Sequence, residues 1–259
     1  MAGNSRYSGE SVTEKVLSIF NIFTVKKNRF TLSEISRLTD LPLSTTHRLV
    51  GELTNWKALH RASDGKYEIG SKMWSIGMLA PIASELRVLA QPIMNDLFVA
   101  TGENVHLAIL DGDKALYIEK VAGQKSVPVI SRVGDRLPLH STGVGKVLLA
   151  YAERELIEHI LKNLTQITSH TITSPAIMKK ELAQVRRDGY AKTNEEMTLG
   201  TYSLAVPVFS SVSLKDENVI AALGLVVRKG RRDLERLAPA LEVASRAITR
   251  RTLSSVQRK

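Results

Sequence analysis

The chain of 259 residues has no cysteine, and aromatic residues make up only 5% of it. Without thiols it forms no disulfide bond and no thiolate metal site. No apolar run approaches the roughly 18 residues that a membrane-spanning helix needs. The first ten residues, MAGNSRYSGE, lack the apolar core of a secretion signal. These absences predict a soluble cytoplasmic protein with no membrane partner.

Signatures of common enzyme classes are also missing. The segment GVGK at 143–146 resembles part of a phosphate-binding loop, but Val147 stands where Ser or Thr is required and the upstream glycine is absent. The six histidines are scattered without an H-E-x-x-H pair, so we predict no metal site. No G-x-S-x-G elbow frames a serine. We therefore expect no catalytic residues and no cofactor.

The most informative segment that is present spans 30–59, FTLSEISRLTDLPLSTTHRLVGELTNWKAL. Thr31 and Glu34 form a T-x-x-E capping box, which predicts a helix start. Pro42 predicts its end, because the residue before a proline avoids helical angles. Ser44 is then placed to cap a second helix. Two short helices joined by a tight turn are the layout of a helix-turn-helix, whose second helix enters a DNA groove.

The second helix is predicted to turn Leu49 and Leu53 inward, with Trp56 packing the small core just beyond it. Its other side carries short hydroxyl side chains, which let a helix lie deep in a groove, and one arginine, which can bind guanine or a phosphate. An ordinary helical hairpin with a solvated helix start is the alternative. The residues predicted to contact DNA from this helix are Ser44, Thr45, Thr46, His47 and Arg48.

A short basic hairpin follows the second helix. Asp64-Gly65 is a strong hairpin signal between two short strands at 59–61 and 67–70. Upstream, Ser11 and Glu14 form a second capping box, which starts a supporting helix. The order of helices, turn and hairpin predicts a winged helix-turn-helix domain at 10–70. Arg61 and Lys66 on the wing are expected to reach backbone phosphates.

The net charge of +10 is concentrated at the two ends of the chain. Residues 1–70 carry a net charge of +3, residues 71–227 are neutral, and residues 228–259 carry +7. A basic N-terminal module is expected if it meets phosphates. The basic C-terminal segment is interpreted as a solvated helix face and tail rather than a second DNA site.

A linker helix is predicted at 71–83, because an apolar segment, GSKMWSIGMLA, ends at Pro81. A lone domain would expose its apolar side chains, so we expect this helix to contact a second copy of the chain. A helix buried against its own domain is the alternative. The residues expected at the contact between copies are Met73, Trp74, Ile76 and Leu79.

The remainder, 84–255, reads as a mixed α/β domain. A helix with Leu86, Leu89, Ile93 and Leu97 on one face opens it. Strands are expected at 104–110, 115–121, 127–133, 203–209 and 219–227. The glycines at 143 and 145 either leave backbone amides open to an anion or let a helix pack against the sheet. Adjacent Glu195 and Glu196 suit a structural role better than paired acid–base chemistry.

With these segments in view, the chain resembles transcription regulators of the IclR (isocitrate lyase regulator) family. The resemblance covers about residues 10–255 and rests on LPLSTTHRL, YEIG, GDRLPLHSTGVGKVLLA and DGYAKTNEEMTLGTYSLAVPV. It implies an α+β protein with an N-terminal winged helix-turn-helix, a linker helix and a C-terminal GAF-like effector-binding domain. It also implies a homodimer or dimer of dimers on a pseudo-palindromic double-stranded DNA site.

The resemblance further implies a pocket for a small-molecule effector, a carboxylate or an aromatic metabolite. Thr193 replaces an acidic residue of family members that bind small acids, and Gly224 and Val226 replace serines. The pocket is then less polar, which favours a larger or more apolar ligand. The residues that the resemblance places at the pocket are Val129, Leu137, Gly143, Val144, Thr193, Ser203, Gly224 and Val226.

The sequence therefore predicts a dimeric, effector-responsive DNA-binding transcription regulator. One alternative is an enzyme whose α/β domain acts on a small molecule, with the N-terminal module as an accessory. A ligand-free architectural DNA binder is the other, but it has no need of a large neutral α/β domain.

Overall fold

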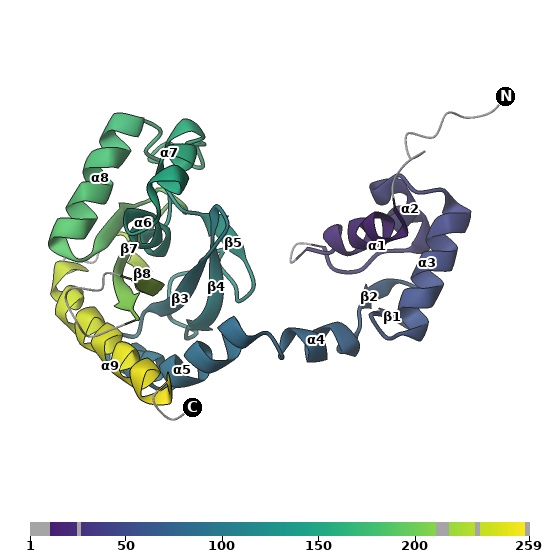
Figure 1. Ribbon diagram of the computed structural model, residues 1–259, viewed down its shortest axis with the longest axis horizontal. Helices are drawn as coiled ribbons and strands as arrows, with labels where there is room; N and C mark the ends of the chain where they lie inside the picture. The colour runs from purple at the N-terminus through teal and green to yellow at the C-terminus, as the bar shows by residue number, and fades with distance from the viewer. Residues whose placement is uncertain (1–10, 25–26, 211–217, 231–233, 257–259) are drawn as a thin grey trace. The chain divides into compact units, whose positions relative to one another are not determined.

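The computed structural model describes residues 11–24, 27–210, 218–230 and 234–256 (Figure 1). Residues 1–10, on which the secretion-signal argument rests, lie outside this part of the chain. The chain divides into two compact units, Met1–Ser84 and Glu85–Lys259.

The first unit is a helix-turn-helix followed by a hairpin. Both predicted capping boxes are formed: the Ser11 hydroxyl accepts from Glu14 N and the Thr31 hydroxyl from Glu34 N. The hairpin strands pair antiparallel around Gly65, whose φ of 81° suits a glycine. The elements are α1 (Val12–Asn21), α2 (Leu32–Thr39), α3 (Leu43–Asn55), β1 (Leu59–Arg61), β2 (Tyr67–Ile69) and α4 (Ser71–Gly77).

The turn between α2 and α3 differs from the prediction at Ser44. Asp40 ends α2 in the left-handed region, with φ of 62°, a conformation that Asp tolerates better than most residues. Pro42 is extended and takes the N-cap position, and its carbonyl accepts from Thr46 N at 2.9 Å. The N-cap is therefore Pro42 rather than Ser44, so the helix begins two residues earlier than predicted, and Ser44 lies in its first turn without capping it.

A small core holds the first unit together, and Trp56 is not part of it. The cluster joins Ile19, Phe30, Ile35, Leu41, Leu49, Val50 and Leu59. The predicted packing of Trp56 is wrong, because its side chain is 52% exposed, with Lys72 Nζ 5.8 Å from the ring centroid. Trp56 is the C-cap of α3 and Lys57 takes a φ of 64°, so the chain turns away from the core face there.

The second unit is built on one antiparallel sheet, with strand order β5-β4-β3-β8-β7-β6. Four of the five predicted strands are confirmed. The strands are β3 (Asn104–Asp111), β4 (Lys114–Val121), β5 (Arg136–Pro138), β6 (Ala191–Asn194), β7 (Thr201–Phe209) and β8 (Val219–Arg228).

The predicted strand at 127–133 is wrong; that segment is irregular. Pro128 lies within it, and proline cannot donate to a sheet. Its carbonyls are satisfied by side chains instead: Asn104 Nδ2 donates to Val127 O at 2.8 Å, and Lys120 Nζ donates to Ser131 O at 2.9 Å. The segment is thereby held beside the sheet without joining it.

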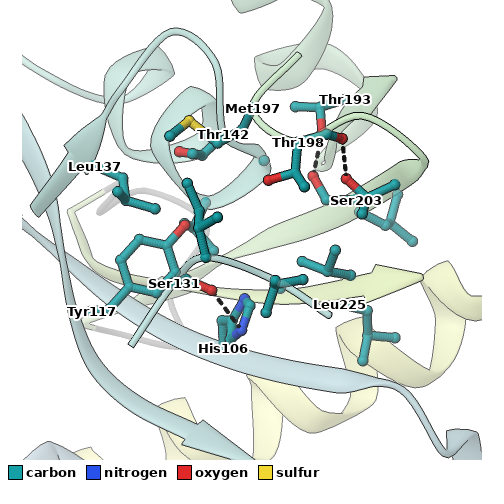
Figure 2. A pocket seen from close by; sticks show the side chains of 18 residues that line it. His106, Tyr117, Ser131, Leu137, Thr142, Thr193, Met197, Thr198, Ser203 and Leu225 are labelled. Carbon is teal, nitrogen blue, oxygen red and sulfur yellow. Dashed lines mark hydrogen bonds between the residues drawn. The ribbon is translucent and has the colours of Figure 1, made fainter. Parts of the chain in front are cut away.

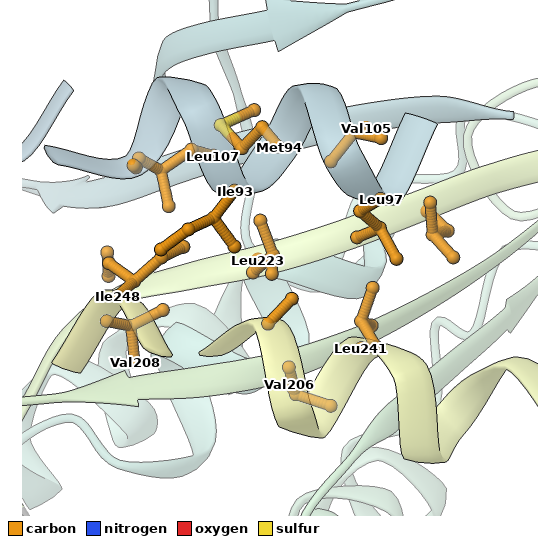
Figure 3. Packing of buried hydrophobic residues seen from close by; sticks show 14 of the residues in the cluster. Ile93, Met94, Leu97, Val105, Leu107, Val206, Val208, Leu223, Leu241 and Ile248 are labelled. Atoms are coloured by element: carbon orange, nitrogen blue, oxygen red, sulfur yellow. The ribbon is translucent and has the colours of Figure 1, made fainter. Parts of the chain in front are cut away.

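Helices cover both faces of the sheet (Figure 1). On one face lie α5 (Pro81–Thr101) and α9 (Ala238–Val256), which follows a short 3-10 helix (Leu234–Leu237). Three residues of the predicted apolar face of α5, Leu86, Ile93 and Leu97, are buried in this core beside Leu223 and Leu241, whereas Leu89 is only half-buried (Figure 3). On the other face lie α6 (Gly143–Ala150), α7 (Arg154–Lys162) and α8 (Pro175–Asp188).

Strand side chains alternate in size between these two faces. Large residues such as Leu204 and Leu223 face α5 and α9, whereas Ala205 and Ala222 face α6. A Cβ at Gly224 would lie 2.8 Å from Val144 Cγ1, so glycine is needed for this approach. The small residues let α6 lie close to the sheet, and the start of α6 forms one wall of the pocket described below.

Candidate nucleic-acid interface and ligand pocket

The core of the first unit determines which side of α3 is exposed. Leu49 and Val50 are buried against α2 and β1, so the opposite side of the helix remains open. Ser44, His47 and Arg48 are exposed there, and Thr45 is half-buried. The structure therefore brings four of the five predicted residues to one accessible face at the start of the helix.

Thr46 is the exception, and its predicted placement on the DNA-contacting face is wrong. Its side chain is fully buried, and its hydroxyl donates to Pro42 O at 3.1 Å and lies 3.4 Å from Leu41 O. These bonds satisfy carbonyls of the turn between α2 and α3. Thr46 therefore stabilises the turn that positions the helix rather than facing outward.

Arg48 has an intramolecular partner on the exposed face. Its guanidinium lies 2.7 Å from Glu52 Oε1 one turn along the helix, and both side chains are more than half exposed. Such exposed pairs contribute only about 0.3–0.5 kcal/mol. Because this pair is weak, a phosphate or a base edge can replace the Glu52 carboxylate as the partner of Arg48.

The hairpin carries the two predicted wing residues. Arg61 is exposed, with its guanidinium 5.7 Å from the Tyr67 ring centroid, and Lys66 is half-buried at the turn. Asp64 Oδ1 accepts from Lys66 N and from Arg29, which also pairs with Glu68 at 3.2 Å. These contacts fix the shape of the wing while the charge of Arg61 stays accessible.

Of the four residues predicted to join two copies, Met73, Trp74 and Ile76 lie on α4 and Leu79 lies just after it, and their exposure differs. Trp74 is 69% exposed and Leu79 is 79% exposed, while Ile76 is also exposed. Met73 is half-buried. The structure thus leaves an apolar surface at α4 that the described residues of this chain do not cover.

All eight residues predicted for the effector pocket line one cavity in the second unit (Figure 2). Strands from distant parts of the sequence, the start of α6 and the irregular segment at 129–131 meet there. Ten further residues line it that the sequence did not indicate: His106, Tyr117, Ile130, Ser131, Thr142, Met197, Thr198, Thr201, Leu204 and Leu225.

Two hydrogen-bonded pairs supply much of the polarity of this pocket. The hydroxyls of Thr193 and Ser203 lie 2.5 Å apart on neighbouring strands, and Ser131 Oγ lies 3.2 Å from His106 Nε2 (Figure 2). His106 is 2% exposed, and burial lowers its pKa to about 3, so the imidazole is neutral. Burial also raises the pKa of Tyr117 well above its usual value. These side chains therefore make the pocket polar without giving it a charge.

One feature of the sequence could have indicated that His106 is a functional residue. It is the single titratable residue in the apolar run VHLAIL of a central strand, and such a residue needs a partner when buried. Ser131 had no comparable signal, because its segment belongs to no strand.

Both explanations of the glycines at the start of α6 apply in part. A Cβ at Gly145 would lie 2.5 Å from Leu139 O, so this glycine is required for packing. Thr142 caps the helix by accepting from Gly145 N at 3.1 Å. A Cβ at Gly143 would lie 2.7 Å from Ser203 Oγ. The helix therefore begins directly against the pocket.

The loop that carries Met197 and Thr198 into the pocket is anchored on both sides by the adjacent glutamates. Glu195 pairs with Lys229 and accepts from Gly200 N at 2.6 Å, and the Lys229 pairing holds its pKa below the usual value. Glu196 lies 2.7 Å from Lys146 Nζ, which is fully buried. The prediction of a structural role for this pair of glutamates is confirmed by these contacts.

Among the described residues, no set of three His, Cys, Asp or Glu side chains is grouped so that it could hold a metal ion. Within the same residues, no helix has both the length and the apolar character needed to cross a membrane.

Comparisons with known proteins agree for both units. Residues 12–63 match the model of the IclR helix-turn-helix domain, and residues 82–250 match the model described as bacterial transcriptional regulator IclR C-terminal. The chain is 34% identical over 247 residues to the HTH-type transcriptional regulator XynR of Escherichia coli K12, covering 92% of this chain and 95% of that protein. It is 31% identical to the transcriptional repressor AllR of the same strain, covering 84% and 80%.

Solved structures show the same architecture. An IclR homolog from Microbacterium hydrocarbonoxydans, crystallised with 4-hydroxybenzoate, superimposes with a TM-score of 0.88 at 30% identity, over 94% of this chain and 100% of that one. The IclR of Thermotoga maritima gives 0.74 at 28% identity, over 93% and 98%. With both domain models, full-length relatives and the fold in agreement, this chain belongs to the IclR family of helix-turn-helix transcriptional regulators.

Proposed function

We propose that this regulator binds a pseudo-palindromic operator as a homodimer in the cytoplasm. In this proposal α3 enters the major groove, with Ser44, Thr45, His47 and Arg48 at base edges or phosphates, and Arg61 and Lys66 contact the flanking backbone. Support comes from the exposure of these residues on one unit whose net charge is positive. Two-fold operators match two-fold protein dimers, with half-sites set by the dimer geometry.

For the contact between copies we propose α4. Trp74 and Ile76 on this helix and Leu79 just after it are large exposed apolar side chains, and contiguous exposed apolar surface often marks an interaction site. In a symmetric dimer this surface would meet its own copy. A dimer of dimers would use further surfaces.

The effector that we propose is an apolar or aromatic carboxylate. The observation that carries this is the composition of the pocket: its described lining contains no Asp, Glu, Lys or Arg, and His106 is neutral. Hydroxyl groups of Thr193 and Ser203 offer hydrogen bonds, and the first amides of α6 favour an anionic group. A relative of the same fold was crystallised with 4-hydroxybenzoate, a ligand of this class.

The cavity volume is about 40 Å³, well below the roughly 300–1,000 Å³ of a typical ligand pocket. A ligand with an aromatic ring therefore requires its walls to move apart. The irregular segment at 129–131 is one wall that no strand pairing holds. We propose that ligand entry displaces this segment.

Two measurements test the proposal. Genomic fragments enriched by the protein should share a pseudo-palindromic site, and a fragment so identified should be titrated with and without 4-hydroxybenzoate or glyoxylate. We expect 4-hydroxybenzoate to bind the pocket more tightly than glyoxylate in calorimetry and to change operator affinity. Tighter binding of glyoxylate would contradict the proposed ligand class, whereas enrichment without any shared site would contradict specific operator binding.

A further inference from the structure

The second unit has another, larger cavity that neither the operator nor the proposed effector uses. Strand β6 pairs only with residues 202–205 of β7, so the last residues of β7 form an open edge. A groove of about 570 Å³ lies along this edge, between the C-terminal end of α8 and α9. Figure 1 shows α8 ending beside α9 at the margin of the sheet.

Four arginines from two distant parts of the chain line this groove: Arg186, Arg187, Arg246 and Arg250. Two carboxylates accompany them, Asp188 at 3.3 Å from Arg187 and Glu242 at 3.6 Å from Arg246. Four positive and two negative charges leave the groove with a net charge of +2. The basic C-terminal segment seen in the sequence is thus concentrated in part on a concave surface.

The helix dipole explains only half of this charge. Arg186 and Arg187 lie in the last turn of α8, where cations are favoured. Arg246 and Arg250 lie in the middle of α9, one turn apart on the same side, and like charges at that spacing destabilise a helix. Both line the groove, so both guanidinium groups are placed to bind an anion there.

The floor of the groove is apolar, and one hydroxyl-bearing side chain lines it beside the arginines. Val206, Pro207, Phe209 and Tyr151 form the floor, with the Tyr151 and Phe209 rings in edge contact at 5.8 Å. Thr249 is 5% exposed and lines the groove. Ser245, one turn earlier, donates to Pro207 O. A threonine hydroxyl can both donate and accept, so Thr249 offers a ligand in the groove one hydrogen bond.

We propose that this groove is a second small-molecule site, separate from the α6 pocket, for an organic dianion on an apolar or aromatic body. The anionic group, a phosphate ester or a dicarboxylate, lies between Arg246 and Arg250 and accepts from Thr249. The apolar body rests on Phe209 and Pro207. Guanidinium groups bind both kinds of oxyanion through paired hydrogen bonds, so the two sources share one recognition chemistry.

Calorimetry on the full chain tests this with three probes: phenyl phosphate, phthalate and uncharged phenol. We expect saturable binding of at least one dianion, one per chain, and no binding of phenol. Substituting both Arg246→Gln and Arg250→Gln should weaken the dianion at least tenfold. Thr249→Val, which keeps the shape, should weaken it severalfold without lowering the melting temperature. The dianion that binds more tightly identifies the anionic group of the ligand.

Two control variants keep the test decisive. Arg154→Gln removes one charge from a fully solvated arginine on α7 and should leave dianion affinity unchanged. Val226→Trp fills the α6 pocket and should also leave it unchanged. Equal weakening by Arg154→Gln would mean that only net charge attracts the probe, and loss in Val226→Trp would place the probe in the α6 pocket. Either of these results would overturn the second site, and so would the absence of saturable binding for both dianions. None of these results would contradict the proposed effector pocket.

Discussion

At the residue scale, Arg48 and Lys66 differ in what surrounds them. Arg48 projects from the exposed face of α3 and pairs with Glu52, whereas Lys66 lies at the tip of the wing beside Asp64. A residue on a recognition helix can read a base edge, but a residue on a wing reaches mainly phosphates. Their substitutions should therefore differ in kind.

We expect Arg48→Ala to cost about 1–3 kcal/mol on the specific operator and to relax preference at one position per half-site. Lys66→Ala should weaken specific and scrambled duplexes alike and make the salt dependence shallower. Titrations of both duplexes at several salt concentrations measure this difference. Equal losses on the two duplexes for Arg48→Ala would reassign that arginine to a phosphate.

Lys146 shows how a buried charge supports the pocket from behind. Its Nζ lies 2.7 Å from Glu196 Oε1, 3.4 Å from Glu181 Oε2 and 3.3 Å from Lys192 O. Glu196 is 5% exposed, and burial raises the pKa of its carboxyl despite the attraction of Lys146. Its other oxygen has no partner within the described part of the chain, so the ammonium group is its main compensation.

Replacing Lys146 by methionine should destabilise the protein by about 3–5 kcal/mol near neutral pH, because a buried carboxylate is left unpaired. An acid whose folded pKa is raised loses stability as pH rises from the unfolded pKa through the folded one. The loss in Lys146→Met should therefore shrink as the pH falls and Glu196 takes up a proton. Denaturant unfolding at several pH values measures this. A loss of the same size at all pH values would show that lost packing, and not the charge, is responsible.

At the element scale, α4 is a short helix with apolar side chains that the described residues of its own chain do not bury. Trp74 and Ile76 on it and Leu79 just after it are exposed, and seven residues are too few for a stable isolated helix. A partner surface would both bury these side chains and hold the helix in shape. This makes α4 the place where assembly and DNA binding meet in the proposed dimer.

Trp74→Glu would place a charge in that desolvated contact, which should be strongly unfavourable. We expect light scattering to show smaller species and operator binding to fall in parallel. Val243→Glu on α9, which replaces an apolar residue that is 68% exposed, is the matched control and should leave assembly unchanged. If Trp74→Glu protein keeps its size, α4 does not hold the copies together.

At the scale of the whole molecule, an effector in one unit can change DNA binding by the other only if both equilibria are linked. The coupling is reciprocal, so a ligand that lowers operator affinity must itself bind more weakly to the operator complex. The pocket lies entirely within the second unit and the predicted DNA-contacting residues lie in the first. Blocking the pocket should therefore remove the response without removing the DNA-binding surface.

Val226→Trp provides this test, since Val226 lines the pocket on β8 opposite Ser203. We expect the indole to fill the cavity, so that the protein binds its operator with an affinity that no longer responds to the effector. Ser203→Ala, which removes one hydrogen bond worth about 0.5–1.5 kcal/mol, should weaken the ligand but keep the response. Operator titrations with and without ligand measure both. A wild-type response in Val226→Trp would place the effector elsewhere.

Local signals in the sequence were enough to predict the helix-turn-helix, its wing and most strands of the sheet. Capping boxes, an Asp-Gly turn and alternating apolar residues act between neighbours a few positions apart, so their physics is contained in a short window. The eight pocket residues came from resemblance to a family, because their shared cavity depends on segments far apart in the chain.

What only the tertiary structure decided concerns residues whose role depends on distant partners. Thr46 looks like its exposed neighbours in the sequence, yet it is buried because the turn before α3 needs its hydroxyl. His106 and Ser131 meet across 25 positions, and Lys146 meets Glu196 across 50. Likewise, Arg186 and Arg246 line one groove because β6 begins opposite Ala205 and leaves the last residues of β7 open at that edge. Residues close together in the sequence specify local geometry, but long-range packing determines which distant charged groups and hydroxyls contact each other.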